Sequence, residues 1–303
     1  MTASPTTRSV HLFEGGLFAN FNNVLNNLKV AAEKPEIVSV RVDWIVLPGL
    51  DFFYAPLGAN AWELFFEPLA FPAAPGRIKR APVFPENMIT NIFAYRLYKF
   101  DRTWRKLYNE LYRQHIRPLP FLTQRVDEIV ARSFAGHRVI GAHVRNPGHS
   151  AENIFDIPPT RDFIEKAREL MGDDPEARVF LATDTAAVAS EFRSAFGERL
   201  IMQPGVERSQ NDGQVHLQRT VGSVDFGAQV IVDVLLLSRC DALLHVTSNV
   251  ATAAGYINPD IPMIYCESPA RRRIGTVIAW LMGSRRVRRR LLNWRLRRRD
   301  WRT

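Results

Sequence analysis

From about residue 138 onward, strand-like and helix-like runs alternate, and this alternation constrains the fold more than any other feature of the chain. The strand-like runs are short and apolar, and the segments between them have helical character; Thr160, after two prolines, is the expected N-cap of the first helix. Such alternation predicts a parallel sheet with right-handed crossovers. The predicted strands are 138–145, 178–183, 199–203, 241–247 and 262–266, and the predicted helices are 160–171, 185–196, 223–239 and 249–257.

The N-terminal half is less regular. It begins with a strand-like run, the turn Gly15-Gly16 and a helix rich in Asn and Leu, and a second strand is predicted over 38–46. The region 86–134 has mostly helical character, which places a domain boundary near 130–137. We therefore expect three parts, 1–134, 135–270 and a basic tail of 271–303.

The net charge of +9 comes entirely from this tail. Residues 271–303 contain 13 Arg and one acid, whereas the remaining chain carries a net charge of −3. The body is therefore not expected to bind nucleic acid. The two cysteines, Cys240 and Cys266, form no metal-binding or disulfide pattern, and the polar N-terminus does not resemble a signal peptide. A cytoplasmic protein is the expectation.

The strand 138–145 ends in a histidine and an arginine, His143 and Arg145. In open α/β sheets, ligands bind in the crevice beyond the carboxyl ends of the strands. A guanidinium at that edge suits a phosphate, which Arg can bind with two parallel hydrogen bonds. The alternative is an ordinary surface arginine at a turn.

Three further groups fall at or near the same predicted edge. Asp184 ends the next strand, Asp233 interrupts an apolar helix, and Thr247, Ser248 and Asn249 lie where a strand passes into a helix. Hydroxyls and free N–H groups at a helix start form an anion site. Asp184, Ser248 and Asn249 could instead be helix caps, and Asp233 could face solvent. Together, the groups favour a nucleotide pocket.

The Gly15-Gly16 turn, with Asn20 in the helix after it, is placed to let backbone approach a ligand closely. It is not a dinucleotide-binding fingerprint, since the third glycine is missing. The chain has no phosphate-binding Gly-Lys-Ser/Thr loop and no Asp-x-Asp pair of the kind that holds a divalent metal on a sugar diphosphate. We therefore expect no metal site and no cofactor.

The order of these motifs resembles the α1,6-fucosyltransferase and protein O-fucosyltransferase superfamily, which includes rhizobial nodulation-factor fucosyltransferases. The resemblance rests on Gly-Gly-Leu near the N-terminus, Gly-x-His-Val-Arg, Leu-Ala-Thr-Asp, and Asp-x-x-x-Leu-Ser-x-x-Asp followed by Ser-Asn-Val. It implies an α/β fold of the GT-B type, with two Rossmann-like domains and a parallel sheet in the C-terminal domain. It also implies an inverting, metal-independent transfer of a sugar, with fucose expected, from a GDP-sugar.

Site roles follow from the same resemblance. Arg145 would bind the β-phosphate, His143 and Asp233 the guanine, and Ser248 and Asn249 the phosphates. Gly15 and Gly16 would line the cleft from the acceptor-side domain 1–134, opposite the nucleotide-sugar domain 135–270. The other substrate-binding candidates are Asn20, Asp184 and Thr247.

The chain departs from the family after Arg145, where Asn146-Pro147-Gly148-His149 replaces a second arginine and Thr-Asp-Lys. The acceptor and the donor sugar are therefore open, and a UDP-sugar or another GDP-sugar is a further reading. A carboxylate or histidine could deprotonate the acceptor hydroxyl. Glu152 is the candidate base because the α1,6 enzymes carry a glutamate nearby; His149 and Asp156 are rivals, and a solvated Glu152 is an alternative.

The aromatic segments 51–54 and 60–67 are interpreted as core in preference to a carbohydrate platform. The second segment resembles bacterial surface-polysaccharide relatives, which hints at a glycan, polysaccharide or lipid-linked acceptor. The apolar run 274–283 is too short to span a membrane. The Trp- and Arg-rich tail of 271–303 suits an anionic membrane surface, so the protein could be peripheral on the inner membrane, unless the tail packs on the body. The alternative function is a non-catalytic membrane or nucleic-acid adaptor acting through this tail.

Overall fold

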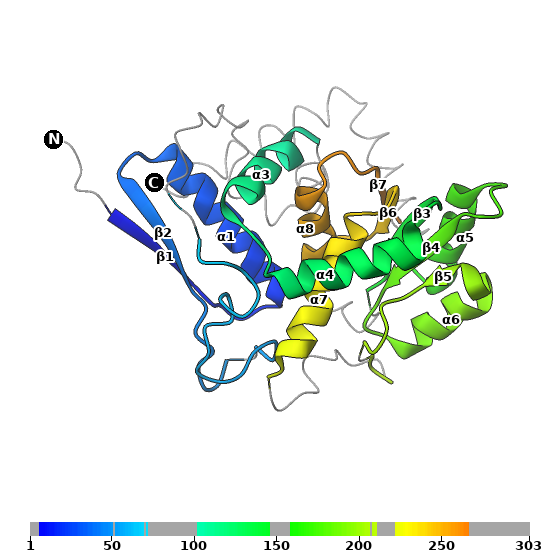
Figure 1. Cartoon of the computed structure of the whole chain (residues 1–303), viewed down its shortest axis with the longest axis horizontal. Coiled ribbons are helices and arrows are strands. Elements are labelled where there is room, and N and C mark those ends of the chain that lie inside the picture. Colours follow the sequence, from blue (N-terminus) through cyan, green and yellow to red (C-terminus); the bar gives the residue numbers. More distant parts are fainter. Residues whose placement is uncertain are drawn as a thin grey trace, which may run out of the picture.

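The computed structural model describes residues 6–50, 52–69, 71, 102–145, 158–206, 208–210 and 222–266. In Figure 1, β1 (Thr6–His11), β2 (Ile37–Asp43) and α1 (Leu17–Glu33) lie at one end of the molecule. The helices α5 (Thr160–Met171) and α6 (Ala186–Phe196) lie at the other end.

The C-terminal half contains a five-stranded, all-parallel sheet, as the alternation predicted. Its strand order is β5-β4-β3-β6-β7, so the chain builds outward from β3 in one direction, then crosses over and continues from β6 in the other. The order therefore reverses between β3 and β6, which is where open α/β sheets bind ligands. The strands are β3 (Val139–His143), β4 (Arg178–Ala182), β5 (Leu200–Ile201), β6 (Ala242–His245) and β7 (Met263–Tyr265).

The two faces of this sheet are covered by different helices. Side chains such as Ile140 and Leu181 pack with α5 and α6 in one apolar cluster. Their neighbours Val139 and Phe180 point to the opposite face, which packs with α7 (Val224–Leu237) and α8 (Asn249–Ile257). Residue alternation places His143 and His245 on this second face.

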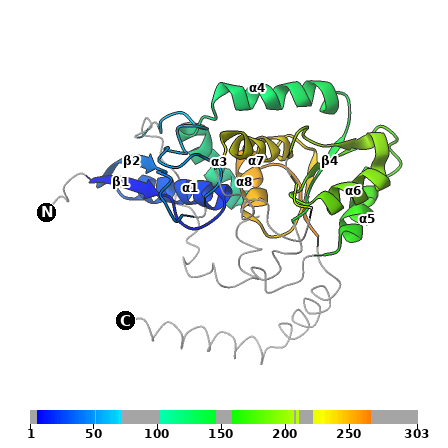
Figure 2. The same cartoon turned by 90° about the horizontal axis from the view of Figure 1, so that it is seen from below.

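The N-terminal half supplies a parallel β1–α1–β2 unit, in which β1 and β2 form a two-stranded sheet. The helix α3 (Arg102–His115) contacts α1 and α8, while α4 (Pro120–Ile129) lies over α7. Figure 2 shows α7 and α8 between α1 and the sheet strand β4. A π-helical turn (Val130–Phe134) then leads into β3, close to the predicted domain boundary, which stays a prediction.

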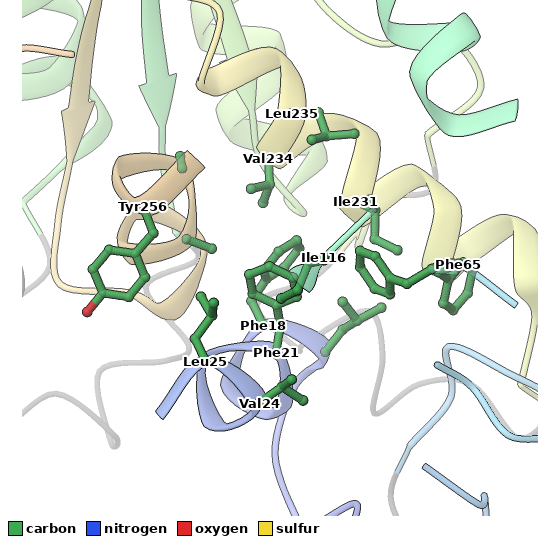
Figure 3. Close-up of a cluster of buried hydrophobic side chains, with 14 of the residues drawn as sticks. Phe18, Phe21, Val24, Leu25, Phe65, Ile116, Ile231, Val234, Leu235 and Tyr256 are labelled. Carbon is green, nitrogen blue, oxygen red and sulfur yellow. The ribbon is translucent and has the colours of Figure 1, made fainter. Parts of the chain in front are cut away.

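The larger hydrophobic core is shared by the two halves. Figure 3 shows Phe18 and Phe21 of α1 facing Ile231 and Val234 of α7, with Tyr256 of α8 beside them. Gly227 of α7 allows a close approach, since a side-chain carbon there would lie 2.3 Å from the Phe65 ring and 2.6 Å from the Tyr54 carbonyl oxygen. The helix α7 therefore packs directly against the loops that follow β2.

The predicted helices 160–171 and 249–257 coincide with α5 and α8. The expectation that Thr160 caps α5 is wrong, because Thr160 is the first helical residue and Pro159 occupies the cap position without a side-chain hydrogen bond. The strand predicted over 38–46 ends at Asp43, and the chain then turns so that Trp44 is fully buried. The strand therefore ends before residue 46, and Trp44 packs into the aromatic core.

Candidate functional site

The carboxyl end of β3 presents His143 and, two residues later, Arg145 at the point where the strand order reverses. His143 Nδ1 lies 3.2 Å from the hydroxyl of Ser248, at the start of α8. These two candidates come from adjacent strand ends, as the parallel sheet predicted. Their contact places a histidine, a hydroxyl and a helix N-terminus together beside the exit of β3.

Ser248 is a helix cap, one of the two roles that the sequence offered for it; its role in phosphate binding stays a prediction. Its hydroxyl accepts from the backbone N–H of Ala251 at 3.0 Å and so caps α8, while the same oxygen contacts His143. Thr247 Oγ1 donates to the Tyr265 hydroxyl at 3.3 Å, which ties the loop to β7. Asn249 is the first residue of the helix. The early N–H groups of a nine-residue helix thus lie beside His143.

The turn before α1 is held by Asn20, which is 0% exposed. Its side-chain oxygen accepts from the Phe13 N–H at 3.0 Å. Its amide nitrogen reaches the carbonyls of Phe13, Gly15 and Gly16 at 3.2–3.4 Å. All these bonds go to backbone, so Asn20 shapes the Gly15-Gly16 turn; its direct contact with substrate stays a prediction.

Two contacts bring this turn to the C-terminal strand ends. Asn22 of α1 donates to the backbone and side-chain oxygens of Asn249 at 3.1 and 3.2 Å. The buried Tyr54 hydroxyl accepts from the Leu17 N–H, and the charges of Asp184 and Arg145 both act on its pKa. Burial, the largest effect, raises the pKa of Tyr54, as does Asp184. The starts of α1 and α8 and the ends of β3 and β4 therefore converge.

Asp184 is not the cap of α6, since Thr185 occupies that position and makes no side-chain capping bond. The Asp184 carboxylate instead accepts from the Thr185 hydroxyl at 3.2 Å. Its backbone oxygen accepts from the Ser209 N–H at 2.7 Å. This leaves Asp184 at the strand end with a carboxylate close to Tyr54.

Asp233 lies in α7 and is partly buried, with Oδ1 accepting from Gln203 Nε2 at 2.9 Å. Burial raises the pKa of Asp233 to about 7, although the Gln203 hydrogen bond and the charges of Arg208 and Arg125 oppose this. The carboxylate therefore has a partner, as its place in an apolar helix required. Asp233 is thus partly buried and hydrogen-bonded, which does not favour the solvent-facing alternative.

Some predicted features lie outside the described residues. They are the base candidates His149, Glu152 and Asp156, and the tail of 271–303. Within the described ranges, no three His, Cys, Asp or Glu residues gather closely enough to hold a metal ion. The helices of those ranges include none that is long and apolar enough to cross a membrane.

The aromatic segments after β2 belong to the core, as the sequence favoured, because Phe52, Trp62 and Phe65 are buried. Tyr54 stacks on Phe226 of α7, with centroids 5.2 Å apart. Sequence reasoning missed the position of Tyr54 in the site, and it missed Asn22 and Gln203. The only local sign of a role for Tyr54 was its hydroxyl within an apolar run, and no local pattern identified its partners.

Comparison with known proteins shows the family and the fold of the chain. Residues 97–271 match the family model described as Nodulation protein Z (NodZ). Nodulation protein Z of Azorhizobium caulinodans is 31% identical over 147 residues, which cover 43% of this chain and 42% of that protein. The Bradyrhizobium diazoefficiens protein of the same name is 28% identical over 145 residues, covering 45% and 38%. The chain thus spans less than half the length of these curated relatives.

A solved structure of NodZ α-1,6-fucosyltransferase soaked with GDP-fucose is similar in fold, with a TM-score of 0.55 and 19% identity. The match covers 86% of this chain and 95% of that chain. It confirms the predicted α/β fold class of the GT-B type. At this identity the likeness concerns the fold.

Proposed function

Because this chain belongs to the nodulation protein Z family, we propose that it is a glycosyltransferase that moves fucose from GDP-fucose to an acceptor hydroxyl. A member of this family was solved after soaking with GDP-fucose, which supports the choice of donor. The matched share of the curated relatives is below one half, so the whole reaction, with its acceptor, belongs to the proposal.

The observation that carries the proposal is the convergence of positive groups at the reversal of strand order. Arg145 follows β3, the α8 start contacts His143 through Ser248, and the α1 start reaches the same place through Tyr54. Helix N-termini and a guanidinium are groups that bind a diphosphate. The arrangement therefore suits a nucleoside diphosphate whose phosphates lie between the two halves.

In this proposal the acceptor hydroxyl attacks the anomeric carbon from the face opposite GDP, so configuration inverts. The bond from carbon to the β-phosphate oxygen breaks, and negative charge grows on the leaving GDP. Arg145 and the helix-start N–H groups are fixed before the reaction and stabilise that charge as it develops. A base takes the acceptor proton, and Glu152 is proposed for it, with His149 and Asp156 as rivals.

We propose that the transfer needs no metal ion, because the positive groups around the phosphates belong to the protein itself. Activity with excess EDTA should equal activity without it. Recovery only on adding Mg²⁺ or Mn²⁺ would overturn this part of the proposal.

The acceptor we propose is a glycan, polysaccharide or lipid-linked sugar at the inner face of the membrane. The Trp- and Arg-rich tail of 271–303 would hold the enzyme on anionic lipid. Vesicles with and without phosphatidylserine test this directly. Equal binding to both kinds of vesicle would contradict attachment of the tail to anionic lipid.

The central test compares two arginines at opposite ends of the same strand. Arg145→Ala should lower GDP-fucose turnover by at least about a hundredfold, because an electrostatic donor to the leaving group is lost. Arg138→Ala removes an exposed guanidinium before β3 and should leave turnover unchanged. Circular dichroism verifies folding of both. Wild-type turnover in folded Arg145→Ala would refute the assignment, and absent GDP binding by the wild type would favour the adaptor function.

A further inference from the structure

Gln203, which follows β5, is a buried glutamine that ties the sheet edge to the middle of α7. It is 1% exposed. Its amide nitrogen donates to Asp233 Oδ1 and to the backbone oxygen of Gln229, both at 2.9 Å. A backbone carbonyl can only accept, so the NH₂ group must face α7 and the amide cannot be flipped. Gln203 therefore holds one carboxylate oxygen of Asp233 in a fixed direction.

Two buried polar atoms in this region lack a hydrogen-bond partner among the described residues. They are the acceptor Oε1 of Gln203 and the donor Nε of Arg208. Arg208 Nη1 donates to the Val206 carbonyl at 3.1 Å, and the Arg208 charge acts on Asp233. A buried donor or acceptor without a hydrogen bond costs free energy, and a ligand that supplies the missing partner removes that cost. The region around Asp233 thus contains one buried acceptor and one buried donor that a ligand could pair.

We propose that Gln203 is a positioning residue that keeps Asp233 ionised and oriented to recognise the guanine base of the donor. The proposal rests on the proposed function and on the guanine contact of Asp233 that the family resemblance implies. Guanine presents its N1–H and 2-amino group as neighbouring donors, and one ionised carboxylate can accept from both. A protonated or rotated carboxyl group loses part of that pairing, so recognition depends on what holds Asp233.

The charges that face Asp233 come from two other segments. Arg208 lies in the segment after β5, and Arg125 of α4 also pairs with Asp225 at 3.5 Å. Burial raises the pKa of Asp233 to about 7, and the Gln203 hydrogen bond is the first of the effects that lower it. Removing this bond must therefore raise the pKa further, so that Asp233 becomes ionised only at a higher pH.

The experiment measures GDP affinity of the full chain by calorimetry from pH 6 to 9. Because guanine pairs with the ionised carboxylate, wild-type affinity should be constant above the pKa of Asp233 and weaken as the pH falls below it. In Gln203→Leu the weakening should begin at higher pH, so that GDP binds about tenfold more weakly near pH 7.5 and recovers towards pH 9. Gln203→Glu keeps the shape and should move the profile in the same direction through like-charge repulsion.

Gln229→Leu is the matched control. Gln229 is 3% exposed, and its side chain ties the same segment to α7 through the Gly205 carbonyl and Asp225. That side chain makes no hydrogen bond to Asp233 in the described structure, so its loss should leave the pH profile in place. Inosine diphosphate, which lacks the 2-amino group, serves as the second probe. The preference for GDP over inosine diphosphate should fall in Gln203→Leu and Gln203→Glu but not in Gln229→Leu.

The outcomes separate the inference from the function on which it rests. If Gln203→Leu or Gln203→Glu binds GDP with the wild-type pH profile and base preference, the inference is wrong and the proposed function stands. A pH-independent loss that is equal in Gln203→Leu and Gln229→Leu would mean that Gln203 only packs, and it also overturns the inference. If the wild type binds no GDP at any pH, both are overturned.

Discussion

On one face of the C-terminal sheet, α5 and α6 pack over a core whose described residues all come from the C-terminal half. On the other face, α7 and α8 pack between the sheet and α1, so that the core there draws on both halves of the chain. The candidate residues His143, Ser248 and Asp233 all belong to this second face. The first face supports the sheet, and the second carries these candidate residues.

Two fully buried phenylalanines offer the strongest test of this difference. Phe192 lies in α6, whereas Phe65 packs at Gly227 of α7. Phe192→Ala and Phe65→Ala should each lower the free energy of unfolding by about 3–5 kcal/mol, measured by urea denaturation. Only Phe65→Ala should also weaken GDP binding, because it loosens α7. Equal effects on GDP affinity would mean that the two faces do not differ in this way.

A smaller effect is expected at the turn before α1. Asn20→Ala leaves the Phe13 N–H and three carbonyls without their buried partner, which should lower the free energy of unfolding by about 2–3 kcal/mol. GDP affinity should fall with it, since the α1 start is displaced. Asn23→Ala, on the same helix, is the control and should change GDP affinity little. Unchanged binding in a folded Asn20→Ala would remove this turn from the site.

The smallest effect is expected when either of two serines that cap a helix is replaced. Ser223 accepts from the Phe226 N–H at 3.3 Å to cap α7, and Ser248 caps α8. Replacing either by Ala should lower the melting temperature slightly, corresponding to about 1 kcal/mol. Ser248→Ala should also raise the Kd for GDP, because it removes the contact with His143 and loosens the start of α8, where the proposal places the phosphates. A Kd shift of the same size in Ser223→Ala would contradict a specific role for Ser248.

The sequence predicted best what depends on local pattern. The bounds of α5 and α8 agree with the helices predicted from the alternation of strand-like and helix-like runs, and the strand ends brought His143 to Ser248. Parallel strands must end at one edge, so a periodic pattern was enough to place these two residues together. The error at Thr160 was also local, because a proline took the cap position.

The rest of the site depends on pairs that are distant in sequence. Gln203 lies 30 residues from Asp233, and Asn22 lies 227 residues from Asn249. No spacing rule links such residues, because their meeting is decided by how whole helices pack. Tyr54 joined the site for the same reason, since its neighbours Arg145 and Asp184 come from the other half of the chain.

The 227-residue separation between Asn22 and Asn249 also bears on how the protein is made. A ribosome adds roughly 5–20 residues each second, so α8 follows α1 by about 10–45 s. During that interval Phe21 and Leu25 of α1 lack the helices α7 and α8 that later cover them. An apolar helix exposed for this long is a natural target for a chaperone. The nascent chain should therefore need a chaperone to stay soluble until α8 has emerged.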